Sequence, residues 1–310
     1  MKTLLLIDAN SIIHRSFHAL PPFTTPVGRP SGALYGIASI LLKLWREARP
    51  DYVAALFDRP EPTFRDKKYA EYKAQRPPAA DELIEQIKGA HDLFYAFGVR
   101  TFEKAGYEAD DLIATLAEKF KHEDDLRVVI LTGDRDTLQL VEGDRVVVET
   151  FNKGVSDTTV YDEAAVVAKY GLKPGQLVDY KALVGDPSDN IKGVSGVGPK
   201  TATETLQTFG SVENIFKNLA GDPKLEKRFG PHRKDAELAR ELVTLERHAP
   251  IEVPALDDLA VPKEDPASMK IYFQTMGFIT LVKRLEGKGA APSAAAARAK
   301  PKKPAQPGLF

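Results

Sequence analysis

Short apolar runs that alternate with amphipathic stretches are the feature that most constrains how this chain folds. Runs typical of strands lie at 3–7, 52–57, 99–102, 127–131 and 145–149, and stretches with the 3.6-residue apolar spacing of helices lie at 37–45, 81–97 and 110–120. This alternation predicts an α/β fold, with a mainly parallel central sheet flanked by helices. In such sheets, ligands bind at the carboxyl ends of the strands.

Three of the expected strands end in carboxylates. Asp8 follows the first strand, Asp58 follows the second, and Asp134 and Asp136 follow the run at 127–131. One such aspartate is commonly a turn former or a helix N-cap, but that explanation serves poorly for all three strands together. Two further acidic clusters stand at Glu108, Asp110 and Asp111, which open a helix, and at Asp186 and Asp189.

Carboxylates that converge on one pocket repel each other unless cations neutralise them. Ligation by oxygen alone favours hard ions such as Mg²⁺ or Mn²⁺, and two such ions can promote phosphodiester hydrolysis without a protein nucleophile. The chain has no cysteine, which excludes disulfides, thiolate zinc sites and cysteine nucleophiles. Its six histidines form no recognisable triad or metal motif, and we expect His14 and His18 to be ordinary surface or packing residues.

The remaining composition limits the class of protein. A chain of 310 residues with 43% hydrophobic residues is large enough for a buried core. No signal peptide or membrane span is visible, so we expect a cytoplasmic protein. The net charge of −1 argues against a simple polyanion binder, but acidic and basic segments are separated along the chain.

Three motifs carry a resemblance to a known family. They are Gly106-Tyr107-Glu108-Ala109-Asp110-Asp111, Thr132-Gly133-Asp134-Arg135-Asp136 and Gly185-Asp186-Pro187-Ser188-Asp189-Asn190. In order and spacing they resemble the bacterial 5′ nuclease family, which includes the 5′–3′ exonuclease domain of DNA polymerase I and relatives of flap endonucleases. The likeness extends from about residue 2 to residue 285.

The resemblance implies a nuclease core of the PIN-like type over 1–172, with an arch at about 59–80. It also implies a helical, helix–hairpin–helix DNA-binding region over 173–286. The implied metal ligands are Asp8, Asp58, Glu108, Asp110, Asp111, Asp134, Asp136, Asp186 and Asp189. We expect Asp8, Asp58 and Asp110 to lie nearer one Mg²⁺ ion, and Asp134, Asp136, Asp186 and Asp189 to lie nearer a second. Glu108 and Asp111 would lie between the two ions. Mn²⁺ would substitute for Mg²⁺.

The resemblance also implies DNA contacts. In the basic insertion, Lys73 and Arg76 would contact phosphates near the scissile bond, Arg65 would assist, and Tyr69 or Tyr72 would stack on an unpaired base. A solvated charged loop is the usual explanation of such a segment taken alone. In the hairpin, Gly196, Gly198, Lys200 and Thr201 would hold a duplex backbone, and the loop would bind K⁺.

The stretch 287–310 is rich in Ala, Lys and Pro, which predicts a flexible basic tail. Its last five residues contain Gln306, Leu309 and Phe310 in the spacing of a peptide that docks on the bacterial sliding clamp; the alternative is a terminus without a partner.

The function that this resemblance implies is a monomeric, nucleoid-associated 5′–3′ exonuclease and flap endonuclease. It would act on flapped, branched or nicked duplex DNA, and on RNA–DNA hybrid, in primer removal and repair. The alternatives are a non-catalytic DNA-junction binding protein, the N-terminal part of a DNA polymerase I, and an RNase of related fold.

Overall fold

The computed structural model describes residues 1–47, 49–152, 157–262 and 266–287. Its larger sheet has six strands in the order β3-β2-β1-β4-β5-β6, of which the first five are parallel and β6 is antiparallel to β5. The strands are β1 (Lys2–Asp8), β2 (Tyr52–Phe57), β3 (Arg100–Glu103), β4 (Leu126–Thr132), β5 (Val146–Phe151) and β6 (Thr158–Tyr161). The expected mainly parallel sheet is confirmed, and the strand order reverses beside β1.

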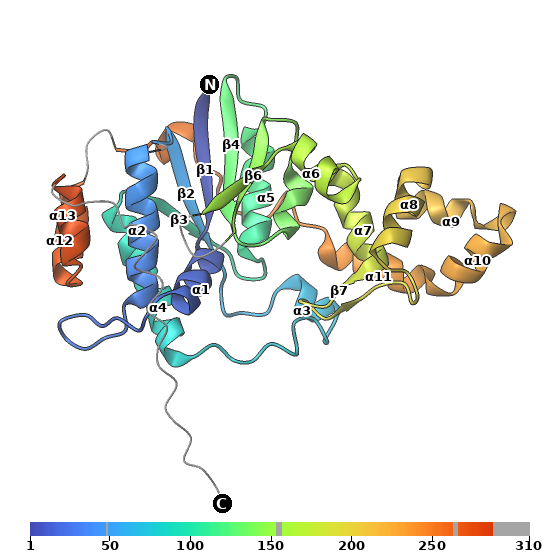
Figure 1. Cartoon of the computed structure of the whole chain (residues 1–310), viewed down its shortest axis with the longest axis horizontal. Coiled ribbons are helices and arrows are strands. Elements are labelled where there is room, and N and C mark those ends of the chain that lie inside the picture. Colours follow the sequence, from blue (N-terminus) through green and yellow to red (C-terminus); the bar gives the residue numbers. More distant parts are fainter. Residues whose placement is uncertain (48, 153–156, 263–265, 288–310) are drawn as a thin grey trace, which may run out of the picture.

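Helices cover both faces of this sheet (Figure 1). On one face lie α1 (Ala9–Ala19), α2 (Gly32–Glu47) and α4 (Asp81–Ala96), and on the other lies α5 (Ala109–Phe120). Successive strand residues point to opposite faces, so Leu4 and Leu6 join the core under α5 while Leu5 and Ile7 join the core under α1 and α2. Burial on both faces explains why the strands are continuous apolar runs rather than alternating ones.

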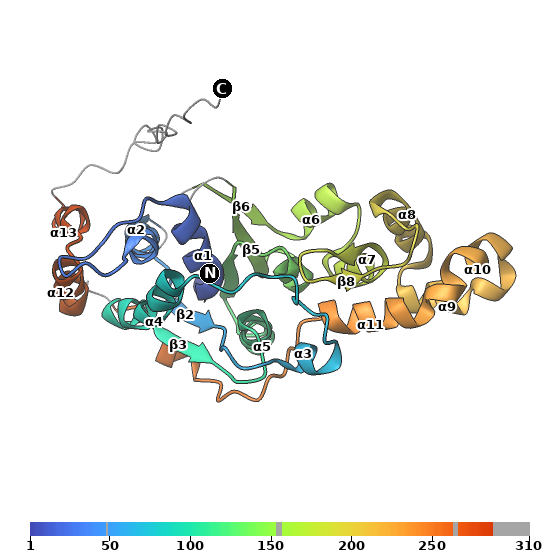
Figure 2. The same cartoon turned by 90° about the horizontal axis from the view of Figure 1, so that it is seen from below.

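A helical arm extends from one edge of the sheet (Figures 1 and 2). It contains α6 (Glu163–Tyr170), α7 (Leu177–Val184), α8 (Pro199–Phe209), α9 (Val212–Lys217), α10 (Pro223–Phe229) and α11 (Arg233–Val243). Two short antiparallel strands, β7 (Gly185–Asp186) and β8 (Ile191–Lys192), lie between α7 and α8. Short 3-10 helices lie at Asp136–Leu140, Pro174–Gln176, Leu219–Gly221, Gly230–His232 and Leu256–Leu259.

The helical DNA-binding region was expected to continue to residue 286, and its final part belongs elsewhere. Helices α12 (Ala267–Thr275) and α13 (Ile279–Leu285) lie beside α2 and α4, at the opposite end of the molecule from the arm (Figure 1). Their apolar residues Met269, Phe273 and Leu281 are fully buried in the same core as α2 and α4. This burial places the last two helices with the nuclease core.

The basic insertion at 59–80 forms a short helix, α3 (Phe64–Lys68), followed by turns. The helix begins at a capping box between Thr63 and Asp66. The turns lie against the β7–β8 hairpin, because the Lys73 amide donates to the Asp189 carbonyl over 3.0 Å and Asn190 donates to the Glu71 carbonyl over 2.8 Å. The insertion therefore closes over the carboxyl end of the sheet.

The tail residues Gln306, Leu309 and Phe310 lie outside the described residues. Within the described part of the chain, none of the helices has both the length and the apolar character needed to cross a membrane.

Candidate metal centre

Four elements bring a first group of carboxylates together at the carboxyl edge of the sheet. Asp8 ends β1, Asp58 follows β2, Asp110 lies in the first turn of α5, and Asp134 follows β4. With Glu108 they line a cavity of about 210 Å³. The shared edge follows from the parallel strand order, as the sequence indicated.

Neighbouring groups hold two of these carboxylates in place. Asp8 caps α1 by accepting a hydrogen bond from the Ser11 amide over 2.9 Å, and it accepts a second from the Thr132 hydroxyl over 2.6 Å. Asp58 accepts from the Ala109 amide over 2.7 Å. Both acids line the cavity, and each still has unused acceptor positions, because a carboxylate offers about four.

The first group lacks cationic partners. Within the described residues, Asp8, Asp58, Asp110 and Asp134 form no ion pair. Burial raises the pKa of Asp8 to about 7, and the negative charge of Asp58 contributes further. Burial and the charge of Asp8 raise the pKa of Asp110 well above its ordinary value. These four acids therefore form a crowded, partly desolvated site in which ionisation costs free energy unless a cation is present.

Asp110 supplies the sharpest test of whether a metal fits here. Its Oδ1 atom is buried and has no hydrogen-bond partner. A buried carboxylate oxygen without a partner costs free energy unless a cation neutralises it. The donors around it are all oxygen atoms, which is the ligand set of Mg²⁺ or Mn²⁺. The residues present fit a hard divalent cation.

A second group consists of Asp136, Asp186 and Asp189. One oxygen from each lies within 4.8 Å of the others. Lys181 on α7 pairs with both Asp136 and Asp186, and its ammonium lies 2.6 Å from the Asp186 carboxylate. Arg76 from the insertion pairs with Asp189 over 2.6 Å. Protein cations thus pair directly with the second group, whereas none of the described cations forms an ion pair with the first group.

Lys181 was not predicted from the sequence as part of the site. Burial alone would lower its pKa, but the charges of Asp136 and Asp186 outweigh that effect and raise it. Burial and the charge of Asp134 raise the pKa of Asp136 to about 7, in spite of Lys181. The available signal was the position of a lysine on the helix that leads into Asp186, but nothing in its spacing marks it as part of the site.

Glu108 and Lys73 connect the two groups. The Lys73 ammonium lies 2.6 Å from a Glu108 oxygen and 3.8 Å from Asp189. Lys73 has a positive φ of 51°, a conformation that its short turn requires. Arg76 lines the first cavity together with Lys73. Both cations stand where a phosphate could approach the acids.

Asp111 was expected to be a metal ligand, and its surroundings contradict that. It is fully buried, and Arg65 binds both of its oxygens in a bidentate pair of 2.8 and 2.7 Å. The amides of Glu108 and Glu246 donate to the same two oxygens. The first-turn position of Asp111 on α5 turns it away from Asp110, so its acceptor positions serve the fold.

Arg65 and Tyr72 were expected to contact DNA, and both are buried. Arg65 is 1% exposed and is held by Asp111 and by main-chain carbonyls. Tyr72 is 5% exposed. Its hydroxyl oxygen lies 3.0 Å from a Glu108 carboxylate oxygen and 3.1 Å from an Asp189 carboxylate oxygen, and either can accept its hydrogen bond. Neither side chain presents a surface to a phosphate or a base in this structure. Tyr69 is only half-buried and bonds to Glu71.

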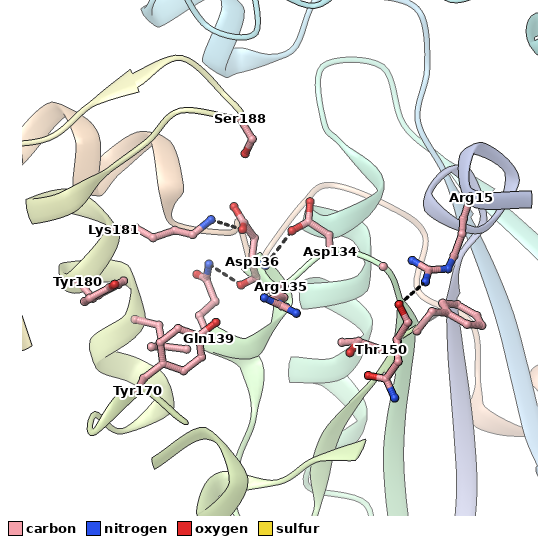
Figure 3. Close-up of a pocket in the computed structure, with 14 residues that line it drawn as sticks. Arg15, Asp134, Arg135, Asp136, Gln139, Thr150, Tyr170, Tyr180, Lys181 and Ser188 are labelled. Carbon is pink, nitrogen blue, oxygen red and sulfur yellow. Dashed lines mark hydrogen bonds and ion pairs between the residues drawn. The ribbon is translucent and has the colours of Figure 1, made fainter. Parts of the chain in front are cut away.

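A larger cavity of about 530 Å³ adjoins Asp134 and Asp136 (Figure 3). Tyr170 and Tyr180 line its far side, and Arg15, Arg135 and Lys181 add positive charge. His14, expected to be an ordinary surface or packing residue, is among the residues that line the smaller cavity.

The loop between β8 and α8 is the hairpin of the expected helix–hairpin–helix region, and its backbone is exposed, as phosphate binding requires. Gly196 has a φ of 75°, and neither Gly196 nor Gly198 has another atom within 4 Å of the place a Cβ would take. Gly198 caps the N-terminus of α8, and Lys200 is exposed on its first turn. Thr201 follows on the same turn. The amides here can therefore approach a phosphate closely.

The structure thus combines a mainly parallel α/β core, a carboxylate-lined carboxyl edge that fits divalent cations, and an exposed glycine hairpin, and comparisons identify the class of protein. A family model described as "5'-3' exonuclease, N-terminal resolvase-like domain" matches residues 3–171, and one described as "5'-3' exonuclease, C-terminal SAM fold" matches residues 172–267. The chain belongs to the 5′–3′ exonuclease family, a family of nucleases.

Two relatives illustrate the match. The 5′–3′ exonuclease of Aquifex aeolicus is 40% identical over 287 residues, which are 92% of this chain and 96% of that protein. DNA polymerase I of Bacillus subtilis is 37% identical over 286 residues, which are 92% of this chain but 32% of that protein. The chain therefore spans nearly all of the first relative and about a third of the second.

Solved structures share the fold. The T5 5′-exonuclease with divalent zinc ions has a TM-score of 0.66 at 24% identity, covering 79% of this chain and 90% of that one. The bacteriophage T5 flap endonuclease in complex with DNA and metal ions has a TM-score of 0.64 at 21% identity, covering 93% and 98%. At these identities the likeness concerns the fold.

Proposed function

We propose that this protein is a structure-specific 5′ nuclease that hydrolyses phosphodiester bonds of DNA with two Mg²⁺ ions, acting as a 5′–3′ exonuclease and a 5′-flap endonuclease. The observation that carries the proposal is the partnerless buried oxygen of Asp110, among carboxylates that form no ion pair within the described residues. A protein that only binds DNA gains nothing from concentrating such charge where a phosphate must approach.

When bound, divalent ions would acidify a water molecule and stabilise the charge on the leaving 3′ oxygen. Asp8, Asp58, Asp110 and Asp134 would hold one ion, and Asp136, Asp186 and Asp189 would hold the other, with Glu108 between them. Mn²⁺ would substitute for Mg²⁺, since both prefer oxygen ligands. Lys181 already neutralises the second group, so its ammonium must leave or share that position when the second ion is present.

Lys73 and Arg76 would bind the phosphates on either side of the scissile bond. Both cations pair with carboxylates of the cluster, so their charged groups already lie beside the acids to which a phosphate would be brought. Charge-assisted hydrogen bonds from a lysine or arginine to phosphate are strong and fix the position of the backbone. This contact would bring the scissile phosphate to the acids.

The hairpin would hold the duplex. Gly196, Gly198, Lys200 and Thr201 offer main-chain amides and one exposed ammonium. Such contacts carry no information about base identity, so binding would depend on the shape of the DNA and on salt. A K⁺ ion at this loop, as the family resemblance implies, belongs to the same proposal.

The wider context follows from the substrate. Flapped, branched and nicked duplexes, and RNA–DNA hybrids with a 5′ end, would be cut during primer removal and repair, by a monomer at the nucleoid in the cytoplasm. Docking of the terminal peptide with Gln306, Leu309 and Phe310 on the sliding clamp stays a prediction, because those residues lie outside the described part of the chain.

The test is cleavage of a 5′-labelled flap on a nicked duplex, with Mg²⁺ or with EDTA, by the wild type, by Asp110→Asn and by Asp144→Asn. Asp144 is an exposed acid just before the amino end of β5, whereas the cluster lies at the carboxyl ends of the strands, so it serves as the control. We expect cutting near the junction in Mg²⁺ only, lost in Asp110→Asn and retained in Asp144→Asn. Tight flap binding without any cutting in Mg²⁺ or Mn²⁺ would instead identify a junction-binding protein.

A further inference from the structure

The segment 242–249, which leads out of α11 toward the sheet, is bonded by an unusual set of buried polar residues. Arg65, Asp111, Thr115 and Gln139 are each at most 6% exposed, and all four bond to this segment. Buried polar groups are satisfied by specific partners, and here the partners come from one short stretch of main chain. In Figure 2 the end of α11 lies beside α3 and α5.

On one side, the segment is tied to the first group of acids. Arg65 donates to the carbonyls of Leu242 and Thr244 over 2.8 and 3.0 Å, while its guanidinium binds Asp111. Asp111 in turn accepts from the Glu108 amide over 3.1 Å, and Arg65 lies 3.5 Å from the Glu108 carboxylate. Glu108 caps the helix that carries Asp110.

On the other side, the segment is tied to the second group. The Gln139 amide group donates to the carbonyls of Val243 and Asp136, each over 3.0 Å, and its oxygen accepts from the Leu245 amide over 3.0 Å. Figure 3 shows Gln139 directly beside Asp136 and Lys181. Every hydrogen-bonding position used by this side chain joins Asp136 to the segment.

We propose that the segment 242–246 is a strut that sets the relative position of the two carboxylate groups, with Arg65 and Gln139 as positioning residues for the cleavage reaction. This inference rests on the proposed nuclease function. The strut continues α11 of the helical arm, so it joins the element that would hold the duplex to both halves of the acid cluster. Gln139 lines the larger cavity, but neither residue is placed among the metal ligands; Arg65 acts through Glu108 and Gln139 acts through Asp136.

A purely structural role would give a different pattern. Thr115 is equally buried, lies on α5 one turn beyond Asp111, and accepts from the Ala249 amide over 3.0 Å. Glu118, a further turn along, pairs with Arg247 over 2.9 Å. Both residues bind the same stretch of chain to the same helix, but the side chain of neither bonds to Glu108 or to a residue of either carboxylate group. Thr115→Val and Glu118→Gln are therefore matched controls.

The experiment compares Arg65→Lys and Gln139→Leu with these two controls, and Gln139→Met replaces Gln139→Leu if that variant does not fold. Four quantities are measured on each full chain: the melting temperature, the Kd for flap DNA in EDTA, the single-turnover cleavage rate in saturating Mg²⁺, and the affinity for Mn²⁺. Displacement of catalytic groups by an ångström costs about 100-fold in rate.

We expect Arg65→Lys and Gln139→Leu to lose about 100-fold in single-turnover rate and to bind Mn²⁺ more weakly, with an unchanged Kd for DNA. The controls should lose melting temperature but keep both rate and Mn²⁺ affinity. Equal losses of rate in controls and test variants, or a loss of DNA affinity alone, would overturn the inference. If the wild type does not cut DNA, the proposed function fails, and the Mn²⁺ affinities alone then decide whether the strut positions the acids.

Discussion

The stability of the metal-free protein should fall as the pH rises, and Asp8 should carry a large part of the effect. Asp8 is 5% exposed, and burial raises its pKa from 3.8 to about 7. Between those two pH values the folded protein binds a proton that the unfolded chain has released. The free energy of unfolding therefore falls by about 1.4 kcal/mol per pH unit up to pH 7 and is level above it. From pH 5 to pH 8 this amounts to about 3 kcal/mol.

The measurement is thermal and urea unfolding in EDTA from pH 5 to pH 8, for the wild type and Asp8→Asn. Asparagine cannot ionise, so the difference between the two proteins isolates Asp8. The subtraction also removes the histidines; burial lowers the pKa of His14, which alone would make stability rise with pH. We expect the wild type to lose roughly 5–10 °C in melting temperature relative to Asp8→Asn over this range.

Adding divalent ions to the same unfolding measurements provides a second test. A cation beside Asp8 favours its charged form, so saturating Mg²⁺ should remove most of the pH dependence in the wild type and leave Asp8→Asn almost unchanged. Parallel stability curves for the two proteins in EDTA would refute the reasoning, because Asp8 would then ionise as easily in the folded protein as in the unfolded chain.

Three further results are expected. Lys73→Ala should lose about 100-fold or more in single-turnover cleavage, since it removes a donor aimed at the charged cluster, whereas Lys104→Ala, outside the cluster, should not. Lys200→Ala should weaken flap binding measured by fluorescence anisotropy, and it should reduce the slope of log binding constant against log salt concentration by about 1. The same slope in both proteins would exclude a phosphate contact. Deleting residues 306–310 should leave flap cleavage unchanged and abolish binding to the bacterial sliding clamp, measured by surface plasmon resonance. Unaltered binding would show that these residues do not dock on the clamp.

Much of the fold could be predicted because its strands are buried on both faces. Such strands are apolar runs with sharp polar ends, and the expected runs at 3–7 and 52–57 match β1 and β2 within a residue or two. β6 was missed because Thr158–Tyr161 is a partly exposed edge strand with no apolar run. The placement of α12 and α13 was missed because amphipathic periodicity shows that a helix has a buried face, but not which distant element covers it.

The site shows the same limit at the scale of single atoms. Asp110 and Asp111 are neighbours with the same chemistry, and sequence placed both among the metal ligands. Successive residues of a helix point about 100° apart, so the two carboxylates face different surroundings. Asp110 has a buried oxygen without a hydrogen-bond partner, whereas both oxygens of Asp111 are bound by Arg65 and two amides. Whether an acid can bind a metal depends on which of its lone pairs remain available. For Asp111 this is decided by Arg65, which lies more than forty positions away along the chain. An acid-rich motif therefore identifies the neighbourhood of a metal site, while the tertiary partners of each carboxylate separate its ligands from its supports.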